Sequence, residues 1–492
     1  MPESPASSEI GPNNVLTVQM RTAIDQLLQT ATVVDRLGEV FTQAGHQLYL
    51  VGGSVRDAVG GRLGQDLDFT TSARPDEIER LLRTLTKTIW TVGREFGTIG
   101  GQLGGWQIEI TTFRADSYVS ESRKPVVQFG DTLEGDLVRR DFTVNAMALS
   151  LPDHHFIDPY GGLDDLIEHR LRTPAEPEVS FSDDPLRMMR AARFAARLGL
   201  VPNPELITAM TELRERLRIV SAERIRDEFS KLLLTDRPRV GLDLLVRTGL
   251  ADIFLPELPA LRLERDEHHR HKDVYVHSLI VLEQAIDLER ARNHPPDLIN
   301  RLAALLHDIG KPRTRRFEAG GKVTFHHHDV VGAKMARKRL KALRYSTDEI
   351  NAVAKLIELH LRFHGYSDGE GGWTDSAVRR YVRDAGGQLE QLHMLTRADC
   401  TTRNQTKATK LRRAYDELEW RIDELAKQEE LDAMRPDLDG NQIMQILGIA
   451  PGRAVGDAYK YLLELRIDNG PMGEERATRE LQAWWAEHNA DS

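Results

Sequence analysis

Strand-like sequence is confined to one part of this 492-residue chain, and this limits the folds that it can adopt. Short apolar runs punctuated by glycine occur at Leu48–Val51, Leu67–Thr71, Thr98–Leu103 and Trp106–Thr112. After Pro185 the apolar residues recur at helical spacing almost to the C-terminus. The pattern predicts an α+β fold, in which one strand-bearing region is followed by all-helical regions.

Composition excludes several classes of protein. No apolar run approaches the roughly 20 residues that a transmembrane helix needs, and the polar first 14 residues contain no signal-peptide core. The single cysteine, Cys400, excludes a disulfide framework and fits the reducing cytoplasm. The length corresponds to about three or four domains. We therefore expect a multidomain cytoplasmic protein with no membrane partner.

Charge is distributed unevenly along the chain. The net charge is −10, and residues 414–492, with 8 basic and 18 acidic side chains, carry all of it. In contrast, Arg301–Tyr345 holds 12 basic and 3 acidic residues, and Arg397–Arg413 holds 6 and 1. Such clusters could neutralise nucleic-acid phosphates, although solvated helix faces would have the same composition.

A glycine pair ends the first predicted strand, at the start of a predicted helix. Gly52 and Gly53 would let backbone N–H groups approach a polyphosphate, and Arg56 could add a charged contact. On the next strand Asp66 and Asp68 are two residues apart, so their carboxylates face the same side. Paired carboxylates suit Mg²⁺, whose ligand shell is completed by substrate phosphates.

Further polar residues follow in the same region. Glu109 is on a later strand, on the face opposite to Ile108 and Ile110, and could be a third carboxylate or an ordinary exposed residue. Arg139–Ala146 adds a dense polar cluster before an apolar run. The chain repeats Asp-Leu-Asp at residues 437–439 with no glycine loop before it, and we interpret that copy as an exposed turn.

Eight sequence segments, taken in order, carry a family resemblance between about residues 48 and 230. They are LVGGSVRD, DLDFTT, FGTIGG, IEITTFR, DLVRRDFTVNAMA, DPYGGLDDL, DDPLRMMRAARFAARLGL and SAERIRDEF. Together they resemble the class II tRNA nucleotidyltransferases (CCA-adding enzymes) and the related bacterial poly(A) polymerases. The resemblance implies a nucleotidyltransferase head with a small mixed β-sheet, followed by all-α neck, HD and tail regions. The implied parts are an N-terminal extension and helix (1–40), the head (41–172), a neck with nucleobase-template and RNA-binding helices (173–264), the HD domain (265–413) and a helical tail (414–492).

The resemblance implies a role for each polar residue of the head. Asp66 and Asp68 would hold Mg²⁺, and Glu109 would be the third catalytic carboxylate. Gly53 and Arg56 would bind the triphosphate. Arg140 would contact the nucleotide and Asp141 its ribose.

Asp184 and Pro185 have a structural interpretation as well, because Asp at an N-cap followed by Pro is a common helix start. The resemblance instead implies that Asp184 and Arg187 form a protein template that pairs with the edge of cytosine or adenine. On the same helix, Arg190 and Arg193 would contact the nucleotide or its phosphates.

Histidine is concentrated in the second half of the chain, where 11 of the 17 lie between His268 and His364. An apolar helical run ends in His307-Asp308, which resembles the HD-domain phosphohydrolases. Imidazole together with carboxylate suits a divalent transition metal. The residues that match the metal ligands are His277, His307, Asp308 and Asp399, and His328 and His360 could complete the site. Alternatively, the HD fold survives only as an RNA-binding scaffold.

The expected function is template-independent addition of CCA to tRNA 3′ ends from CTP and ATP, with a possible accessory HD phosphohydrolase activity. A poly(A) polymerase, or a partial enzyme that adds only CC or only A, would share the head motifs. The apparently complete Arg114–Phe129 segment, with Tyr118, Arg123 and Pro125, favours full CCA addition. An alternative of a different class is an HD metal phosphohydrolase whose head only holds RNA, but intact Asp66 and Asp68 argue against it.

Overall fold

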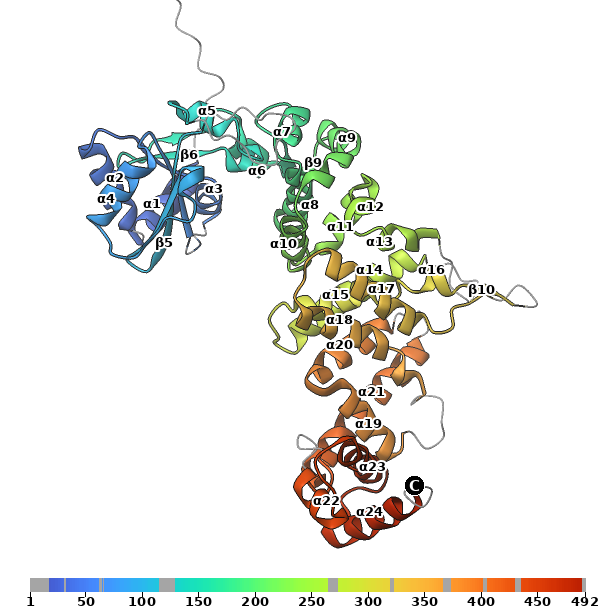
Figure 1. Cartoon of the computed structure of the whole chain (residues 1–492). Coiled ribbons are helices and arrows are strands. Elements are labelled where there is room, and N and C mark those ends of the chain that lie inside the picture. Colours follow the sequence, from blue (N-terminus) through green and yellow to red (C-terminus); the bar gives the residue numbers. More distant parts are fainter. Residues whose placement is uncertain are drawn as a thin grey trace, which may run out of the picture. The chain divides into compact units, whose positions relative to one another are not determined.

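The computed structural model describes residues 17–30, 32–61, 64, 66–114, 129–263, 273–318, 323–365, 373–400, 405–429 and 435–488. The Arg114–Phe129 segment that bears on full activity therefore falls, between its two ends, outside the described residues. The chain divides into two compact units, Met1–Pro256 and Glu257–Ser492 (Figure 1). Each unit is described by itself. No described helix is both long enough and apolar enough to span a bilayer.

The first unit is built on a seven-stranded mixed sheet. Its order is β3-β4-β5-β2-β1-β6-β7, and β2 and β5 run parallel while the other neighbouring pairs are antiparallel. The strands are β1 (Leu48–Val51), β2 (Asp66–Thr71), β3 (Ile89–Trp90), β4 (Thr98–Leu103), β5 (Trp106–Thr112), β6 (Ala148–Leu151) and β7 (Phe156–Ile157). The predicted α+β fold with a mixed sheet is thus confirmed.

One face of this sheet is covered by helices and the other carries the polar residues. The helices α1 (Val18–Thr30), α2 (Val33–Gln43), α3 (Gly53–Val59) and α4 (Pro75–Arg83) contribute buried apolar side chains to one core with alternate residues of the strands. A smaller core on the other face includes Leu133 and Leu137 of α5 (Leu133–Leu137). Because side chains alternate along a strand, the acidic residues of β2 and β5 face away from the helical layer.

The rest of the first unit is mainly helical. It contains η1 (Arg94–Phe96), η2 (Thr143–Asn145), α6 (Gly162–Ile167), α7 (Pro177–Asp183), α8 (Leu186–Leu198), α9 (Pro204–Glu212), η3 (Arg214–Ile219), α10 (Ala222–Leu233), α11 (Pro238–Arg247) and α12 (Leu250–Phe254). Helix α8 packs against α10 and α11. The contact with α11 is close at Gly241, where a Cβ atom would be 2.5 Å from the carbonyl oxygen of Ala192. A buried ion pair, Arg193–Glu228, joins α8 to α10.

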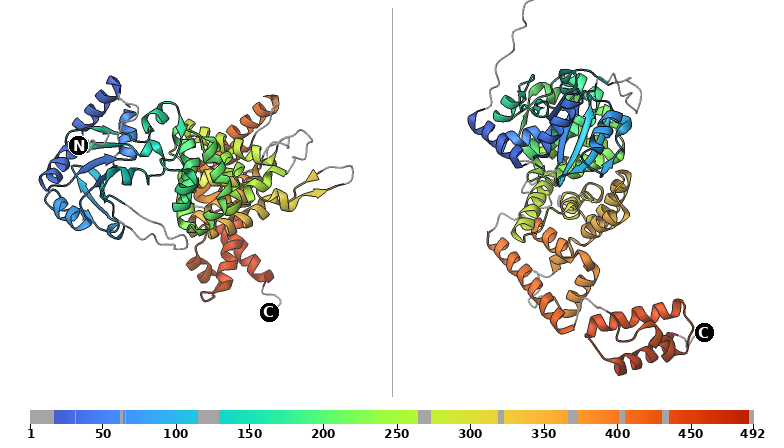
Figure 2. Two further views of the ribbon diagram at one scale, coloured as in Figure 1. Left: turned by 90° about the horizontal axis from the view of Figure 1, so that it is seen from above. Right: turned by 90° about the vertical axis from the view of Figure 1, so that its left-hand side faces the viewer.

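The second unit is almost entirely helical. Its elements begin with α13 (Glu257–Ala260), η4 (Leu261–Leu263), α14 (Val274–Ala291), α15 (Leu298–Leu306), α16 (Lys311–Thr314), α17 (His328–Ala342), α18 (Thr347–Leu359) and η5 (Arg362–Gly365). They continue with α19 (Asp375–Ala385), η6 (Gly386–Gln388), α20 (Leu389–Asp399), α21 (Gln405–Glu429), α22 (Gly440–Leu447), α23 (Arg453–Asn469) and α24 (Glu474–His488). The last three helices share a small core of their own (Figure 2).

Several short strands depart from the sequence expectation. The strand-bearing region does not end near Phe113, because β6 lies beside β1 inside the sheet and β7 follows it. The expectation of helix alone after Pro185 is also wrong. Strand β9 (Val201–Pro202) pairs with β8 (Arg170–Leu171), and β10 (Arg316–Phe317) pairs with β11 (Val323–Thr324). Two-residue strands are too short for an alternating pattern to reveal them.

Candidate functional site

The carboxylates of β2 and β5 lie together on the sheet face without the helical layer. Asp68 and Glu109 are directly opposite each other in the parallel β2–β5 pair, and Asp66 lies on the same face of β2. Burial raises the pKa of Asp68, to which the charge of Asp66 also adds while Arg140 acts against it. Burial, Asp68 and Asp66 likewise raise the pKa of Glu109. A cation between these groups would relieve their repulsion, so the donor set fits a metal that prefers oxygen ligands.

The turn between β1 and α3 holds this strand in place. The Ser54 hydroxyl accepts a hydrogen bond from the Asp68 backbone N–H at 3.1 Å and donates one to the Asp66 carbonyl oxygen at 3.3 Å. Gly52 precedes it with φ of +70°, a conformation that favours glycine. A Cβ atom on Gly52 would also be 3.0 Å from a guanidinium nitrogen of Arg140. The glycine pair therefore lets Arg140 approach the carboxylates.

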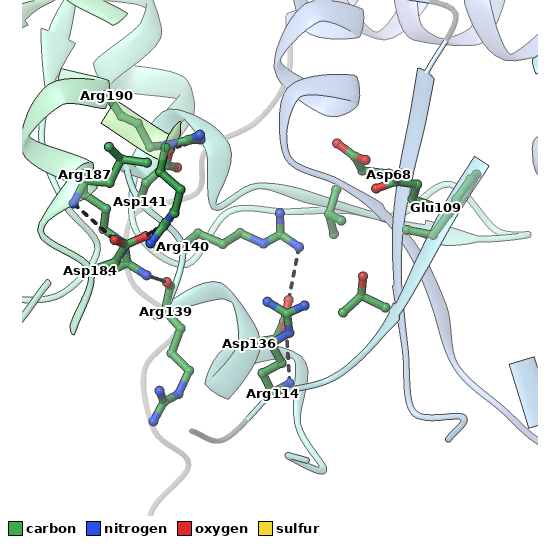
Figure 3. A pocket seen from close by; sticks show the side chains of 15 residues that line it. Asp68, Glu109, Arg114, Asp136, Arg139, Arg140, Asp141, Asp184, Arg187 and Arg190 are labelled. Carbon is green, nitrogen blue, oxygen red and sulfur yellow. Dashed lines mark hydrogen bonds and ion pairs between the residues drawn. The ribbon is translucent and has the colours of Figure 1, made fainter. Parts of the chain in front are cut away.

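A pocket of about 360 Å³ has Asp68 and Glu109 on its wall, whereas Asp66 is not one of its lining residues (Figure 3). This volume lies within the range of roughly 300–1,000 Å³ that is typical of small-molecule sites. Apart from Asp68 and Glu109, its polar lining is mostly arginine and aspartate from the segments that follow β5 in the chain. The lining residues are Val51, Asp68, Phe69, Glu109, Thr111, Arg114, Asp136, Arg139, Arg140, Asp141, Asp184, Leu186, Arg187, Arg190 and Arg224.

Asp136 connects two arginines of the pocket. Its carboxylate accepts a hydrogen bond from Arg140 at 3.2 Å and another from the backbone N–H of Arg114 at 3.3 Å. Among the described residues, the buried Nε atoms of Arg114 and Arg140 have no hydrogen-bond partner. Figure 3 shows Arg140 between the carboxylates of the sheet and the residues of α8. Because both residues line the pocket, their guanidinium groups can meet an anionic ligand there.

The wall formed by α8 contains paired acids and arginines. Asp141 forms an ion pair with Arg190. Burial alone would raise the pKa of Asp141, but the charge of Arg190 and a hydrogen bond from Asn145 hold it below its usual value. Asp184 forms an ion pair with Arg224 at 2.7 Å. This wall therefore offers charged hydrogen-bonding groups with defined orientations, as the recognition of a nucleobase edge requires.

Asp184 contacts the start of α8 and also lines the pocket, and its role as a template stays a prediction. One of its carboxylate oxygens accepts a hydrogen bond from the Leu186 backbone N–H at 3.1 Å, at the start of α8. The other is bound by Arg224, and the residue lines the pocket. Arg187 also lines it, held by the carbonyl oxygen of Arg139 and by the Ser180 hydroxyl at 2.8 Å.

Three expected nucleotide-binding residues do not line the pocket. Arg56 is buried, bound to Asn145 and Asp57. Arg193 is buried in its ion pair with Glu228. Gly53 is the first residue of α3. These contacts favour a supporting role for the two arginines, whose nucleotide contacts stay a prediction.

Four histidine residues of the second unit form a compact cluster with two carboxylates. Two triplets could each hold a metal ion, because their ligand atoms lie within 4.8 Å of one another, and both include Asp308. The triplets are His277, His307 and Asp308, and Asp308, His328 and His360. Asp399 also belongs to the cluster, 2.9 Å from Nε2 of His277. All four expected ligands are thus brought together, with His328 and His360 beside them.

Backbone carbonyl groups orient three of these imidazole rings. Nδ1 of His307, His328 and His360 lies 2.9, 2.8 and 2.6 Å from a carbonyl oxygen three residues earlier. Since a carbonyl oxygen only accepts, each Nδ1 must donate, and in the neutral ring Nε2 keeps its lone pair. Nε2 of His360 is buried without a hydrogen-bond partner among the described residues, and burial lowers the pKa of this ring to about 4. Rings held in this way are suited to metal ligation.

The carboxylates compensate positive charge in the same cluster. Burial would lower the pKa of His307, but Asp308 and Asp399 outweigh it and raise the pKa to about 10. The pKa values of Asp308 and Asp399 are held well below their usual range, against the effect of burial, mainly by His307. The cluster is therefore built to hold positive charge in a buried place.

Comparison with known proteins places both regions in families. The model described as "Poly A polymerase head domain" matches residues 48–172, "Probable RNA and SrmB- binding site of polymerase A" matches residues 199–261, and "HD domain" matches residues 274–404. The A-adding tRNA nucleotidyltransferase of Deinococcus radiodurans is 32% identical over 451 residues, which are 90% of this chain and 96% of that protein. The chain belongs to the tRNA nucleotidyltransferase family. The expected family is thus confirmed.

Other relatives of this tRNA nucleotidyltransferase match only in part. The CCA-adding enzyme of Levilactobacillus brevis is 43% identical over 213 residues, 43% of this chain and 52% of that enzyme. The CCA-adding enzyme of Bacillus subtilis is 41% identical over 228 residues, 46% of this chain and 55% of that enzyme. The chain thus matches about half the length of these two CCA-adding relatives.

Solved structures show that this tRNA nucleotidyltransferase shares its fold with CCA-adding enzymes. The Bacillus stearothermophilus CCA-adding enzyme in complex with CTP matches with a TM-score of 0.63 at 23% identity, over 94% of this chain and 99% of that one. The Thermotoga maritima CCA-adding enzyme complexed with tRNA matches with a TM-score of 0.60 at 18% identity, over 95% and 98%.

Sequence reasoning did not single out four residues of the pocket region. They are Gly52 as a close neighbour of Arg140, and Arg114, Asp136 and Arg224. Asp136 and Arg224 lie within the segments DLVRRDFTVNAMA and SAERIRDEF, so the signal was present in the chain. The sequence did not show which residues these side chains contact. Arg224, for example, binds Asp184, which lies 40 residues earlier in the chain.

Proposed function

We propose that this tRNA nucleotidyltransferase adds CCA to tRNA 3′ ends, using CTP and ATP. The observation that carries the proposal is that one pocket has carboxylates of β2 and β5 on one wall and Asp184 and Arg187 on another. Such a pocket could accept a nucleoside triphosphate with its phosphates near the carboxylates and its base near the template pair. The CCA-adding relatives and the shared fold support this assignment.

The residues of the head divide the work of the reaction. Asp66, Asp68 and Glu109 would hold Mg²⁺, which supplies activation of the RNA 3′-hydroxyl and stabilisation of charge on the transferred phosphoryl group. Arg140 and Arg114, which line the pocket, would bind the triphosphate through their guanidinium groups.

The α8 wall would bind the remainder of the nucleotide. Asp141, kept ionised by Arg190, would accept hydrogen bonds from the ribose hydroxyls. Asp184 and Arg187 would pair with the base edge. Arg56 and Arg193 would stabilise this wall through their buried contacts with Asn145 and Glu228. Gly53 would allow the turn after β1 to approach the phosphates.

One comparison favours a second candidate, the addition of the terminal A alone. The relative that matches along nearly its whole length is an A-adding enzyme, whereas the two CCA-adding relatives match over about half of theirs. The relatives described above are named as an A-adding tRNA nucleotidyltransferase and CCA-adding enzymes, so poly(A) addition has no support beyond the names of two family models.

The two candidates differ in the tRNA end that each requires. The test offers tRNA lacking CCA, and tRNA ending in CC, with CTP alone, with ATP alone and with both, followed by sequencing of the product ends. A CCA-adding enzyme completes both substrates when both nucleotides are present. Extension of only the CC-ended tRNA would establish the A-adding function instead, and long adenosine tracts would indicate a poly(A) polymerase.

We further propose that the histidine cluster is a metal-dependent phosphohydrolase site. His277, His307, Asp308 and Asp399 would hold a divalent transition metal, and His328 and His360 would share Asp308 with them. The support is the fixed orientation of three rings and the unpartnered buried Nε2 of His360. A metal ion there would polarise a phosphate ester and lower the pKa of bound water.

The two sites use separate residues and can be tested separately. His307→Ala should remove bound metal and phosphatase activity toward phosphomonoesters and cyclic phosphates, and leave nucleotide addition unchanged. The exposed His294, on the same unit, provides the matched control His294→Ala. If a folded His307→Ala variant kept its metal content and hydrolase activity, the histidine cluster would be a scaffold only.

Three broader assignments belong with this proposal. A tRNA-processing role supports a cytoplasmic location and tRNA as the macromolecular partner. The division at residues 40, 172, 264 and 413 stays a proposal, although the matched family regions fall inside three of its parts. Limited proteolysis followed by mass spectrometry of the fragments would test these boundaries.

A further inference from the structure

The short strand β10 lies a few residues after Asp308 of the histidine cluster. It carries an exposed aromatic ring among arginines. Phe317 is 73% exposed. The guanidinium carbon of Arg315 lies 5.3 Å from the centre of its ring. Arg313, Arg315 and Arg316 are exposed as well. An exposed ring beside guanidinium groups offers a flat stacking surface and positive charge in the same place.

We propose that the segment Arg313–Phe317 binds the single-stranded end of an RNA and presents its terminal phosphate to the histidine cluster. This inference rests on the proposed hydrolase function and names its substrate class. Phe317 would stack on a base and the arginines would contact phosphates, which is how proteins commonly hold single strands. Bases within a duplex are already stacked and could not use the ring.

The connection to the cluster is short. Lys311, the first residue of α16, donates a hydrogen bond to Asp308 at 2.8 Å. From Lys311 to Phe317 the chain spans at most about 22 Å, even if fully extended. A terminal phosphate at Asp308 would therefore be followed within a few nucleotides by the aromatic ring.

The positive and negative side chains of this hairpin lie in different places relative to the ring of Phe317. Arg315 directly precedes β10 and lies against the ring of Phe317, and Phe317 pairs with Val323 of β11. The one nearby carboxylate of the described hairpin strands and their flanks, Glu318, accepts a hydrogen bond from Thr324 and lies 3.6 Å from His326. Its charge is thus directed toward β11 and the residues after it, rather than toward the ring.

A protein or lipid partner is disfavoured by the same surface. Among the described residues of the second unit, only Phe317 and Trp420 are large hydrophobic side chains with high exposure, and Trp420 belongs to α21. There is thus no broad apolar patch around Phe317 of the kind that protein interfaces bury. An isolated ring with neighbouring positive charges fits a nucleobase and its phosphates better.

The binding test uses the full-length protein in EDTA, so that neither metal-dependent reaction proceeds. The probe is a fluorescein-labelled single-stranded RNA pentamer with a 3′-phosphate, followed by fluorescence anisotropy. Phe317→Ala should weaken binding about tenfold, and Phe317→Trp should restore it. Trp420→Ala, which removes the other exposed aromatic residue, should have no effect.

Salt dependence separates base stacking from phosphate contact. Arg315→Glu with Arg316→Glu should weaken binding and flatten its salt dependence, whereas Arg290→Glu on α14 should not. Unchanged binding of the pentamer by Phe317→Ala, an equal loss with Trp420→Ala, or an equal loss for a blunt RNA duplex would each overturn the proposal.

Hydrolysis then distinguishes this inference from the function on which it rests. With metal present, Phe317→Ala should slow dephosphorylation of the 3′-phosphorylated pentamer and leave that of a nucleoside 3′-monophosphate unchanged. Absence of hydrolysis by the unaltered protein would refute the hydrolase proposal, while the binding experiment would still decide whether Arg313–Phe317 holds single-stranded RNA.

Discussion

The same tripeptide, Asp-Leu-Asp, has two different roles in this protein. On β2 both carboxylates face the pocket side of the sheet, and Asp68 lies opposite Glu109. At residues 437–439, by contrast, Asp439 caps α22 and Asp437 binds Arg466 at 2.6 Å. The interpretation of the second copy as an exposed turn is wrong, because Leu438 is buried in the core of the last helices. Alternation along a strand predicted the first arrangement, but only the fold shows the second.

Asp68→Asn should abolish nucleotide addition and leave the fold intact. The substitution removes a charge from the carboxylate group without creating a cavity, so we expect a loss of about 10³-fold in kcat, or roughly 4 kcal/mol. The measurement is single-turnover incorporation of labelled CTP into tRNA. Asp76→Asn, on the remote surface helix α4, serves as the control and should keep normal activity. Near-normal incorporation by the Asp68 variant would refute the metal assignment.

Residue types alone could not separate the pocket arginines from the supporting ones. Arg56 and Arg193 belong to the same motifs as Arg140 and Arg187, yet their guanidinium groups are buried in contacts with other protein groups. Whether an arginine meets a ligand or a carboxylate of its own protein depends on packing of distant segments, which one sequence does not reveal.

Arg224 should influence the choice between CTP and ATP. It binds one oxygen of Asp184, the proposed template residue, at 2.7 Å, so its removal leaves that oxygen without its partner. Arg224→Ala should change the ratio of kcat/KM for CTP and ATP by about tenfold, equivalent to roughly 1.4 kcal/mol. Arg218→Ala, which removes an exposed arginine paired with Glu215, should leave the ratio unchanged. An equal effect of both variants would show that the change is not specific to Asp184.

Among the elements, those with a strong repeating pattern were predictable. The runs at residues 48–51, 98–103 and 106–112 are strands with the same bounds, because alternate side chains enter one core. Strand β6 was missed although it pairs with all of β1. The strand, Ala148–Leu151, is short and mostly buried, so its sequence shows no alternation of apolar and polar residues. Its place beside β1 depends on pairing across about 100 residues.

The buried Arg193–Glu228 pair should be essential for the packing of α8 on α10. Glu228→Gln leaves a buried guanidinium without its counter-charge, so we expect a loss of about 3–5 kcal/mol in the free energy of unfolding. Chemical denaturation, followed by a signal that reports on the first unit, measures this loss in the free energy of unfolding. The neighbouring surface pair Arg226–Asp227 gives the control, since Asp227→Asn should cost at most about 1 kcal/mol. A combined Arg193→Met, Glu228→Leu variant should recover much of the stability.

At the scale of the whole molecule, the basic stretch Arg301–Tyr345 is less uniform than its composition suggests. Arg301 is buried against Glu289, and Arg339 is paired with Glu257. Neither is available for phosphates. Lys334, Lys338 and Lys341, in contrast, are exposed on α17 at spacings that place them on one face.

Reversing these three lysines to glutamate should weaken tRNA binding and reduce its salt dependence. Each lost phosphate contact lowers the slope of log K against log salt by about one. Filter binding at several salt concentrations provides the measurement, and CTP affinity should stay unchanged because the nucleotide pocket lies in the other unit. If tRNA binding kept its strength and slope, this helix face would be solvated only.

Arginine side chains of the HD region bind carboxylates of the acidic tail, and this suggests a role for the tail's negative charge in RNA binding. Arg380 binds Asp468 at 2.7 Å and Arg383 binds Glu464 at 2.8 Å, while Arg379 donates to the carbonyl oxygen of Ile467. The carboxylates of α23 thus occupy guanidinium groups of α19 as a nucleic-acid phosphate would. RNA could reach these guanidinium groups only by displacing the carboxylates of α23. We therefore expect Glu464→Gln with Asp468→Asn to increase the affinity for unrelated RNA in a gel-shift assay, so that the tail's negative charge limits retention of the wrong RNA.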